Sequence, residues 1–427
     1  MLFEPWVRNW DEAWYAEIIK NMAVKDYGWL MPWWNGRYYF DHPPLYFWLS
    51  GVVVKLFGLG EWQVRIVAIL AGLGVVWLTY LVGKKLFNRR AGILASLVLV
   101  SLGQVGVRFS HGNLDSLMIF FFLLTFYLWL KDKWVLAGIS LGLGFLVKGW
   151  LLGMFPVALI LIYGHKLSVK KLAGLMAIAV GVFLLWVIPA GIKFGKPMID
   201  RYLWQADAGR LSRPTAMWSL KFFEYVMRDL GLWIIPGLLM VTKKRRRVLP
   251  FLVTSFGFIL GLSFLDEKSD WYLLPAYPLL ALSVGQVASR WKGVILTGLV
   301  LAGLINAYRV EMMYPDRSAV GATLGRYAKN IIPRGETVIL DDHDFTAWLF
   351  YADVGMVYVP FDSAQGKPGE WWTLKYEEIP DLVQEKGQVW WITPQTAREW
   401  PGVSSVKVSE YQGYSFWRMA LRSGSVM

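Results

Sequence analysis

From about residue 62 to residue 309 the chain alternates long apolar runs with short polar connections. A membrane-spanning helix needs about 20 consecutive apolar residues, because each residue adds only about 1.5 Å across the hydrocarbon core. Several runs are shorter than this, and we expect the two that meet at Lys148 to enter the membrane only partway. The pattern predicts ten spans, at residues 62–83, 92–107, 115–130, 134–148, 150–164, 172–192, 228–242, 249–265, 271–289 and 293–309.

Basic residues concentrate in every second connection between these runs. Lys and Arg cluster at 84–90, 131–133, 166–171, 243–247 and 290–292, whereas the short connections between these clusters hold only Arg108, Lys148 and Lys268. Short connections rich in Lys and Arg stay in the cytoplasm. We therefore expect a multi-pass plasma-membrane protein whose residues 1–60, loop 193–227 and chain beyond residue 309 face outward.

The opening segment, residues 1–60, contains no apolar run long enough to cross a membrane. Its pattern predicts an amphipathic helix from about Asp11 to Val24, a turn at 33–37 and a half-apolar helix from about Leu45 to Phe57. An exported segment needs a signal or a span before it. We therefore expect the natural reading frame to begin upstream, with one further apolar helix.

The tail, residues 310–427, has a different pattern. Short β-branched and aromatic runs at 337–340, 356–359 and 388–392 predict strands, and the stretches 318–331 and 345–352 predict helices. This alternation predicts a small α/β domain of about 110 residues. The fold class is thus a polytopic α-helical membrane protein, with a helix bundle at 61–309 and an outward-facing α/β domain at 310–427.

Composition supports a membrane protein and excludes other classes. Of 427 residues 56% are hydrophobic and 18% charged, and the 25 Trp and 20 Tyr suit the aromatic belts at membrane surfaces. The net charge of +13 resides largely in the short connections, so we expect no nucleic-acid partner. The chain has no Cys, which excludes disulfides and thiolate metal sites.

Asp11 and Glu12 are the first candidates for chemistry. A structural role is that they begin a helix, because Asn9 followed three residues later by Glu12 matches a capping box. A functional role is that a carboxylate outside the membrane deprotonates an acceptor hydroxyl or stabilises charge on a sugar. Hard carboxylates also suit Mg²⁺ or Mn²⁺, so Asp11 and Glu12 are the candidate ligands if a divalent cation takes part.

Further candidates lie where the predicted spans reach the outward face. His42 follows Asp41 and precedes two prolines that fix the backbone, so it can be a structural residue or donate to a phosphate. Arg108 and Asp115 bracket a short outward loop. Arg108 can extend its guanidinium to water, and Asp115 can cap the next helix, or both can belong to a site.

Two lysines and a tyrosine complete the set. Lys148 interrupts an apolar stretch, and a charge within a membrane indicates function, here with an anion as its partner. Lys268 and Tyr272 lie at an outward helix end, where a lysine and a phenol can bind a lipid-borne phosphate. Together the outward face offers carboxylates for a hydroxyl and cations for a phosphate.

In these residues the chain resembles the GT-C membrane glycosyltransferases, specifically the group of the lipid A aminoarabinose transferases and the dolichyl-phosphate-mannose protein mannosyltransferases. The resemblance runs in order over roughly residues 10 to 290 and rests on 11–17, 41–49, 56–58 with Arg65, 143–149, and Lys268 with 272–275. It implies a polyprenyl-phosphate sugar donor, an outward-facing reaction and one inverting displacement. It also implies that Asp11 is the catalytic carboxylate, that Asp115 is a second acidic position, and that Lys148, Lys268 and Tyr272 lie near the donor phosphate. The resemblance also leads us to expect the first span of the family upstream of residue 1, as the topology does.

We therefore expect a glycosyltransferase that moves a hexose or pentose, such as mannose, to a hydroxyl of a protein, a glycolipid or a polysaccharide. Asp11 would act as the base, while His42, Arg108, Lys268 and Tyr272 would stabilise the departing phosphate. Two alternatives remain open. A transporter of lipid-linked sugars would show paired half-structures, of which the sequence has no sign. An inactive membrane scaffold would leave the outward charges unexplained.

Overall fold

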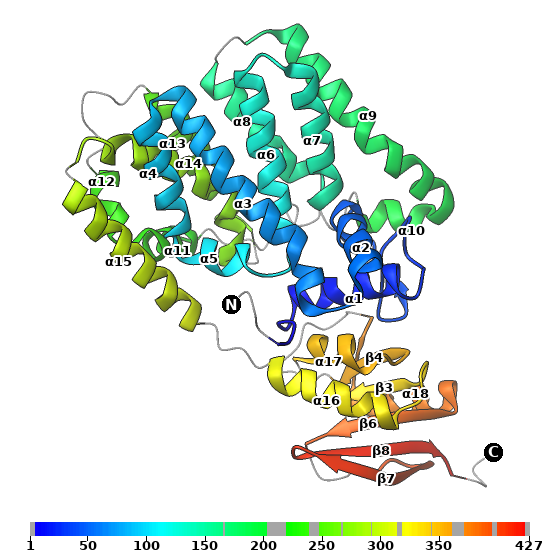
Figure 1. Cartoon of the computed structure of the whole chain (residues 1–427). Helices are drawn as coiled ribbons and strands as arrows, with labels where there is room; N and C mark the ends of the chain where they lie inside the picture. The colour runs from blue at the N-terminus through cyan, green and yellow to red at the C-terminus, as the bar shows by residue number, and fades with distance from the viewer. Residues whose placement is uncertain are drawn as a thin grey trace. The chain divides into compact units, whose positions relative to one another are not determined.

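The computed structural model forms two compact units (Figure 1). The helical unit consists mainly of Gly28–Pro32 and Tyr39–Pro315, and the α/β unit of Glu4–Tyr27, Trp33–Tyr38 and Asp316–Met427. These units do not follow the boundaries predicted at residues 60 and 309, because the first helix packs with the tail. The structure describes residues 5–164, 167–202, 219–238, 247–265, 268–291, 293–313, 318–342, 344–360, 371–394 and 399–422.

Some predictions lie outside these described residues. They are residues 203–218 of the predicted outward loop, and the basic positions Lys166, 243–246 and Lys292.

The helical unit contains a helix at every predicted span, although several spans are broken. Its elements are α2 (Leu45–Phe57), α3 (Glu61–Leu86), α4 (Arg89–Val100), α5 (Gly103–Phe109), α6 (Leu114–Leu130), α7 (Trp134–Lys148), α8 (Trp150–Tyr163), α9 (Val169–Phe194), α10 (Lys196–Ile199), α11 (Lys221–Leu230), η2 (Gly231–Trp233), α12 (Ile234–Leu238), α13 (Leu249–Leu262), η5 (Asp270–Ala276), α14 (Tyr277–Ala288) and α15 (Gly293–Met312).

The count of ten spans is not confirmed. Among the described residues, α3, α9 and α15 are each long and apolar enough to cross a membrane. The predicted span 92–107 is divided into α4 and α5, which meet at an angle of 77°. The predicted span 271–289 begins as the 3₁₀ helix η5 before it becomes α14. The hydrophobic pattern therefore located the helices but did not reveal where they bend.

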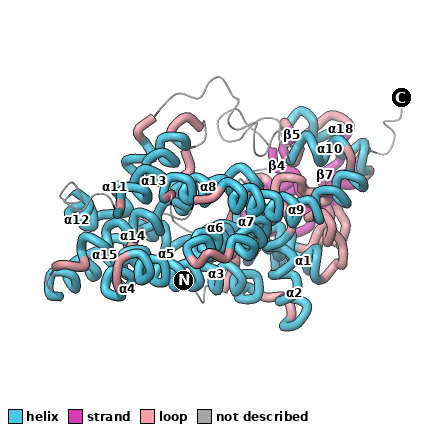
Figure 2. Tube along the Cα trace, turned by 90° about the horizontal axis from the view of Figure 1, so that it is seen from above, coloured by secondary structure: helices cyan, strands magenta, loops and turns pink. Residues whose placement is uncertain are grey.

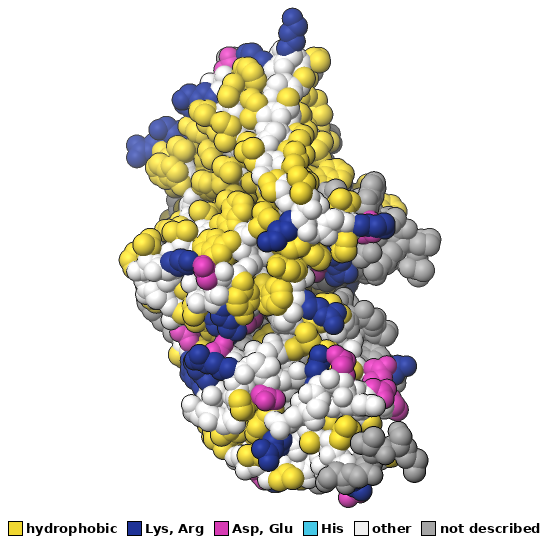
Figure 3. All heavy atoms as spheres, turned by 90° about the vertical axis from the view of Figure 1, so that its right-hand side faces the viewer, with side chains coloured by type: hydrophobic (Ala, Val, Ile, Leu, Met, Phe, Trp, Pro, Cys, Tyr) yellow, Lys and Arg dark blue, Asp and Glu magenta, His cyan; other side chains and the backbone are white. Residues whose placement is uncertain are grey.

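On the face that Figure 3 shows, apolar side chains, drawn in yellow, cover much of the helical unit. On α9, Leu185 is 78% exposed and Ile192 is 81% exposed. An apolar surface of this kind is unfavourable in water and suits contact with lipid. Inside the unit, small residues let helices approach closely: a Cβ added at Gly285 on α14 would lie 2.5 Å from the backbone nitrogen of Ala95 on α4.

The α/β unit has a six-stranded sheet in the order β5-β4-β3-β6-β8-β7, and Figure 2 shows the strands in magenta. The inner strands β4, β3 and β6 are parallel, and β8 and β7 form an antiparallel hairpin at one edge. The elements are α1 (Asp11–Ala23), β1 (Trp33–Trp34), β2 (Arg37–Tyr38), α16 (Ser318–Ile331), β3 (Thr337–Leu340), α17 (Phe345–Ala352), β4 (Met356–Pro360), β5 (Thr373–Leu374), η6 (Tyr376–Glu378), α18 (Ile379–Lys386), β6 (Gln388–Thr393), β7 (Val403–Tyr411) and β8 (Tyr414–Leu421). The predicted α/β tail is confirmed.

Sequences outside the tail complete this unit. Asn35 and Gly36 form the tight turn between β1 and β2, with φ angles of 47° and 81° that suit Asn and Gly. The Asn35 side chain accepts a hydrogen bond from Val357 N (2.7 Å) and donates to Val357 O (2.8 Å), so it pairs with the backbone of β4 as a neighbouring strand would. The indole rings of Trp14 and Trp34 stack at 3.7 Å.

Helix α1 also carries a buried ion pair. Lys20 Nζ lies 2.5 Å from Glu17 and donates to the carbonyl oxygen of Phe350 on α17 at 2.6 Å. Burial raises the pKa of Glu17 and lowers the pKa of Lys20, because both charged forms lose water, and their mutual attraction opposes both shifts. These contacts fix α1 against α17.

Candidate active site

The eight predicted site residues divide between the two units. Asp11 and Glu12 belong to the α/β unit, and the other six, His42, Arg108, Asp115, Lys148, Lys268 and Tyr272, belong to the helical unit.

The start of α1 differs from the predicted capping box. Asn9 does not cap the helix, because its side-chain oxygen accepts a hydrogen bond from Ala347 N of α17 at 3.0 Å. Glu12 is buried, and its carboxylate accepts from Arg8 N at 2.8 Å, which closes the turn before the helix. Asp11 is only partly buried. Glu12 thus has a structural contact, and the role of Asp11 as base stays a prediction.

Asp115 does not cap its helix either. The cap of α6 is Asn113, whose side chain accepts from Ser116 N at 3.2 Å. The Asp115 carboxylate instead lies 2.5 Å from Lys148 Nζ, and the two side chains are 5% and 11% exposed. Lys148 is the last residue of α7, and Gly149, with a φ of 106°, ends the helix. The anion predicted for Lys148 is thus, in this structure, the Asp115 carboxylate.

Arg108 and the segment around Tyr272 come together. The Arg108 guanidinium lies 4.2 Å from the ring centre of Trp271, a cation–π contact between the end of α5 and the start of η5. Tyr272 follows Trp271, and their rings meet edge to face at 6.0 Å. Lys268 lies just before η5 and donates to Ser263 O at 2.7 Å and to Leu265 O. The structure therefore gathers Arg108, Lys268 and Tyr272 around one short segment.

His42 lies beside an ion pair that the sequence did not reveal. Arg201 donates through Nε and a terminal nitrogen to the two carboxylate oxygens of Asp41, at 2.5 and 3.3 Å. The His42 ring meets Tyr39 edge to face at 5.8 Å. A two-point arginine–carboxylate contact has a fixed geometry, so it holds the backbone next to His42. Asp41 and Arg201 are 160 residues apart, so no local sequence pattern indicates that they pair.

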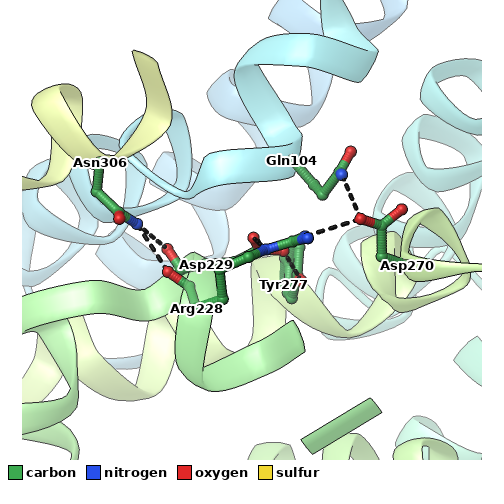
Figure 4. Close-up of polar contacts among 6 residues, drawn as sticks. All are labelled: Gln104, Arg228, Asp229, Asp270, Tyr277 and Asn306. Atoms are coloured by element: carbon green, nitrogen blue, oxygen red, sulfur yellow. Dashed lines mark hydrogen bonds and ion pairs between the residues drawn. The ribbon is translucent and has the colours of Figure 1, made fainter. Parts of the chain in front are cut away.

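A buried network of polar side chains was also missed, and Figure 4 shows how these side chains converge. Arg228 donates to Asp229 and to Asp270, both at 2.8 Å, and Gln104 donates to Asp270 at 2.6 Å. Tyr277 donates to the other oxygen of Asp229. The available signal was the charged pair Arg228 and Asp229 at the start of a predicted span, where charges are costly unless paired.

The Asp270 contacts fix the segment that bears Trp271 and Tyr272. We expect Asp270→Asn to weaken donor binding, because Arg228 then loses one anionic partner and η5 loses its anchor. A hydrogen bond to a charged group contributes about 1.5–3 kcal/mol, so the donor KM should rise about tenfold or more. Steady-state kinetics over a range of donor concentrations measure this. Asp200→Asn, which removes an exposed ion pair with Lys196, is the control and should leave the donor KM unchanged.

A metal site is not apparent. Among the described residues no three His, Asp or Glu side chains form a group that could hold a metal ion. A divalent cation at Asp11 and Glu12 stays a prediction.

The chain is similar to known membrane glycosyltransferases in sequence. A family model described as dolichyl-phosphate-mannose-protein mannosyltransferase matches residues 41–192. The chain is 26% identical over 341 residues to the undecaprenyl phosphate-alpha-4-amino-4-deoxy-L-arabinose arabinosyl transferase of Pseudomonas aeruginosa strain UCBPP-PA14. The match covers 71% of this chain and 62% of that relative, so the chain spans about three fifths of the relative's length.

Solved structures give a longer match. ArnT from Cupriavidus metallidurans bound to undecaprenyl phosphate superposes with a TM-score of 0.75 at 15% identity, covering 97% of this chain and 94% of ArnT. The chain shares the fold of this transferase. The Archaeoglobus fulgidus oligosaccharyltransferase in its apo form matches with a TM-score of 0.55 at 14% identity, covering 92% of this chain and 67% of that one. The resemblance to the GT-C group of the aminoarabinose transferases is thereby confirmed, and the transporter alternative gains no support.

Proposed function

We propose that this GT-C protein transfers a sugar from a polyprenyl-phosphate donor to an acceptor hydroxyl. The observation that carries the proposal is the likeness, over 97% of the chain, to a structure that holds undecaprenyl phosphate. The donor sugar is a pentose such as the aminoarabinose named for the relatives, or a hexose such as mannose. The acceptor is a glycolipid, a protein or a polysaccharide.

The reaction we propose is a single displacement at the anomeric carbon. The acceptor oxygen forms a bond to this carbon as the bond to the phosphate oxygen breaks, so the configuration inverts. Asp11 takes the hydroxyl proton, which keeps the attacking oxygen nucleophilic. The departing phosphate gains negative charge in the transition state, and this charge needs preorganised donors and cations.

The groups that we assign to the phosphate lie around η5. Arg108 is held over Trp271 at 4.2 Å, Tyr272 follows that residue, and Lys268 precedes the helix. A guanidinium, a phenol and an ammonium can donate hydrogen bonds to the phosphate oxygens. His42 is assigned to the same phosphate from its motif, and Lys148 is assigned to orient Asp115.

We also propose that this chemistry occurs on the outward face of the membrane. The support is the placement of Lys and Arg in alternate connections, which assigns the ends bearing Arg108 and Lys268 to the opposite side from the basic loops.

The test is transfer of labelled sugar by the full chain in liposomes. Synthetic undecaprenyl-phosphate aminoarabinose and polyprenyl-phosphate mannose serve as donors, each with a glycolipid, a peptide or a polysaccharide acceptor. We expect label on one acceptor with inverted anomeric configuration, read by NMR of the product. Donor that crosses the bilayer with its glycosyl bond intact, under every acceptor tried, would contradict the proposal and establish a transporter.

A further inference from the structure

The residue before Asp11 has an unusual backbone conformation. Trp10 has a φ of 66°, in the left-handed region that bulky residues seldom adopt. Such a conformation persists only where surrounding contacts over-determine it, and it is found most often at functional sites. In this protein those contacts come from the tail, more than 300 residues away in sequence.

Five hydrogen bonds connect Asn9 and Trp10 to the tail, and one of them runs from Thr346 Oγ1 to Asn9 Oδ1 at 3.5 Å. Asn9 N donates to Ser318 Oγ at 2.6 Å, and Trp10 N donates to Thr346 Oγ1 at 2.6 Å. The Trp10 indole nitrogen donates to Asp344 at 3.2 Å, and Ala347 N donates to Asn9 Oδ1 at 3.0 Å. Consecutive backbone amides at residues 9 and 10 are thus each fixed by a hydroxyl of the tail. These are the two amides directly before Asp11.

The tail residues that make these contacts belong to two helices and to the residue before one of them. Ser318 begins α16, Thr346 and Ala347 lie in the first turn of α17, and Asp344 directly precedes α17. Helix α17 packs against both α16 and α1. The segment that leads into α1 is therefore held by the same helices against which α1 packs.

We propose that Thr346 and Ser318 are positioning residues that set the carboxylate of Asp11 for proton transfer. This inference rests on the proposed function, in which Asp11 is the base. It assigns the tail domain the role of positioning that base. A base must lie within hydrogen-bonding reach of the proton that it takes. A displacement of about 1 Å at a reacting group can cost on the order of 100-fold in rate.

The two hydroxyls are suited to this role because each accepts a hydrogen bond from a backbone amide of the segment, and Thr346 Oγ1 also donates to Asn9 Oδ1. Thr346 is 1% exposed and Ser318 is 0% exposed, so water cannot replace either hydroxyl without rearrangement. Removing one hydroxyl leaves a partly buried amide without this acceptor, next to a disfavoured φ. We expect the backbone of residues 9 and 10 to relax from this conformation, which displaces the Asp11 carboxylate.

The experiment compares Thr346→Val, Thr346→Ser and Thr393→Val in the full chain. Val keeps the shape of Thr but lacks the hydroxyl, and Ser restores the hydroxyl. Thr393→Val is the matched control, because Thr393 is also buried and its hydroxyl bonds Asp341 rather than the segment. We measure kcat and donor KM, and separately the hydrogen exchange of the peptide that contains residues 8–12.

The expected result is that Thr346→Val lowers kcat by roughly 10- to 100-fold with the donor KM unchanged. Its peptide should exchange faster than in the wild type. Thr346→Ser should restore both values, and Thr393→Val should keep both near the wild type even if it lowers the unfolding temperature.

Three outcomes would contradict either the inference or the proposed function. Wild-type kcat in Thr346→Val overturns the inference, whether or not exchange becomes faster. A fall in kcat that Thr393→Val reproduces also overturns it, because the effect is then general loss of stability. If the wild type transfers no sugar from any donor, the proposed function fails, and the exchange data alone then decide whether the tail holds the segment.

Discussion

Replacing Asp11 by Asn is expected to abolish sugar transfer while leaving the fold and donor binding intact. Asn has nearly the shape of Asp but cannot accept a proton at neutral pH, and a positioned base contributes about 10²- to 10⁴-fold to a rate. The site tolerates the change, because Asp11 is partly exposed at the first turn of α1. The measurement is the initial rate of label transfer, with donor affinity determined separately by binding.

The control for this variant is Asp381→Asn, which removes an exposed carboxylate from the first turn of α18 in the same unit. Both variants lose one negative charge near a helix N-terminus, so both should lose similar, small amounts of stability. Turnover near the wild-type rate in Asp11→Asn would remove Asp11 from the mechanism. It would leave the donor assignment in place, because those residues belong to the helical unit.

Secondary structure was the part of the fold that the sequence predicted best. The helices Ser318–Ile331 and Phe345–Ala352 and the strand Thr337–Leu340 begin and end where the pattern placed them. The hairpin β7–β8 was missed, because the consecutive Ser404 and Ser405 interrupt the alternation of apolar and polar residues along β7. Gln412 and Gly413, both with positive φ, were the available turn signal.

The site was predicted less completely, because its contacts join distant residues. A lysine within an apolar stretch indicates that an anion lies nearby, but the sequence does not identify that anion. Asp115 was chosen as a candidate, yet its pairing with Lys148 depends on how α6 and α7 pack. The same holds for Asn9, which fits a capping box locally but bonds Ala347, 338 residues later.

The α/β unit combines segments from both ends of the chain. Sequence order suggested an independent tail, but α1 and the β1–β2 turn complete the α/β unit. The predicted base therefore belongs with the tail, and the predicted phosphate ligands belong with the helices. A truncation that removes the tail should thus deprive α1 of its packing partner α17, not merely remove an accessory domain.

Breaking the pair between Asp115 and Lys148 is expected to have the largest effect on stability. Removing one member of a buried ion pair leaves an uncompensated charge and costs about 3–5 kcal/mol, whereas removing both costs much less. Lys148→Met and Asp115→Asn should each lower the free energy of unfolding in detergent by that amount. The double variant should recover most of the loss, which a double-mutant cycle measures as a coupling energy.

The matched control is the pair of Asp132 and Lys171, which lie 2.6 Å apart with side chains 42% and 36% exposed. Because water screens this pair, its coupling should be only about 0–1 kcal/mol. A coupling for Asp115 and Lys148 as small as this would contradict the buried pair. Repeating the cycle with undecaprenyl phosphate separates the two roles of Lys148: if the lysine moves to the lipid phosphate, its coupling to Asp115 must fall, and if it serves only to orient Asp115, the coupling must persist.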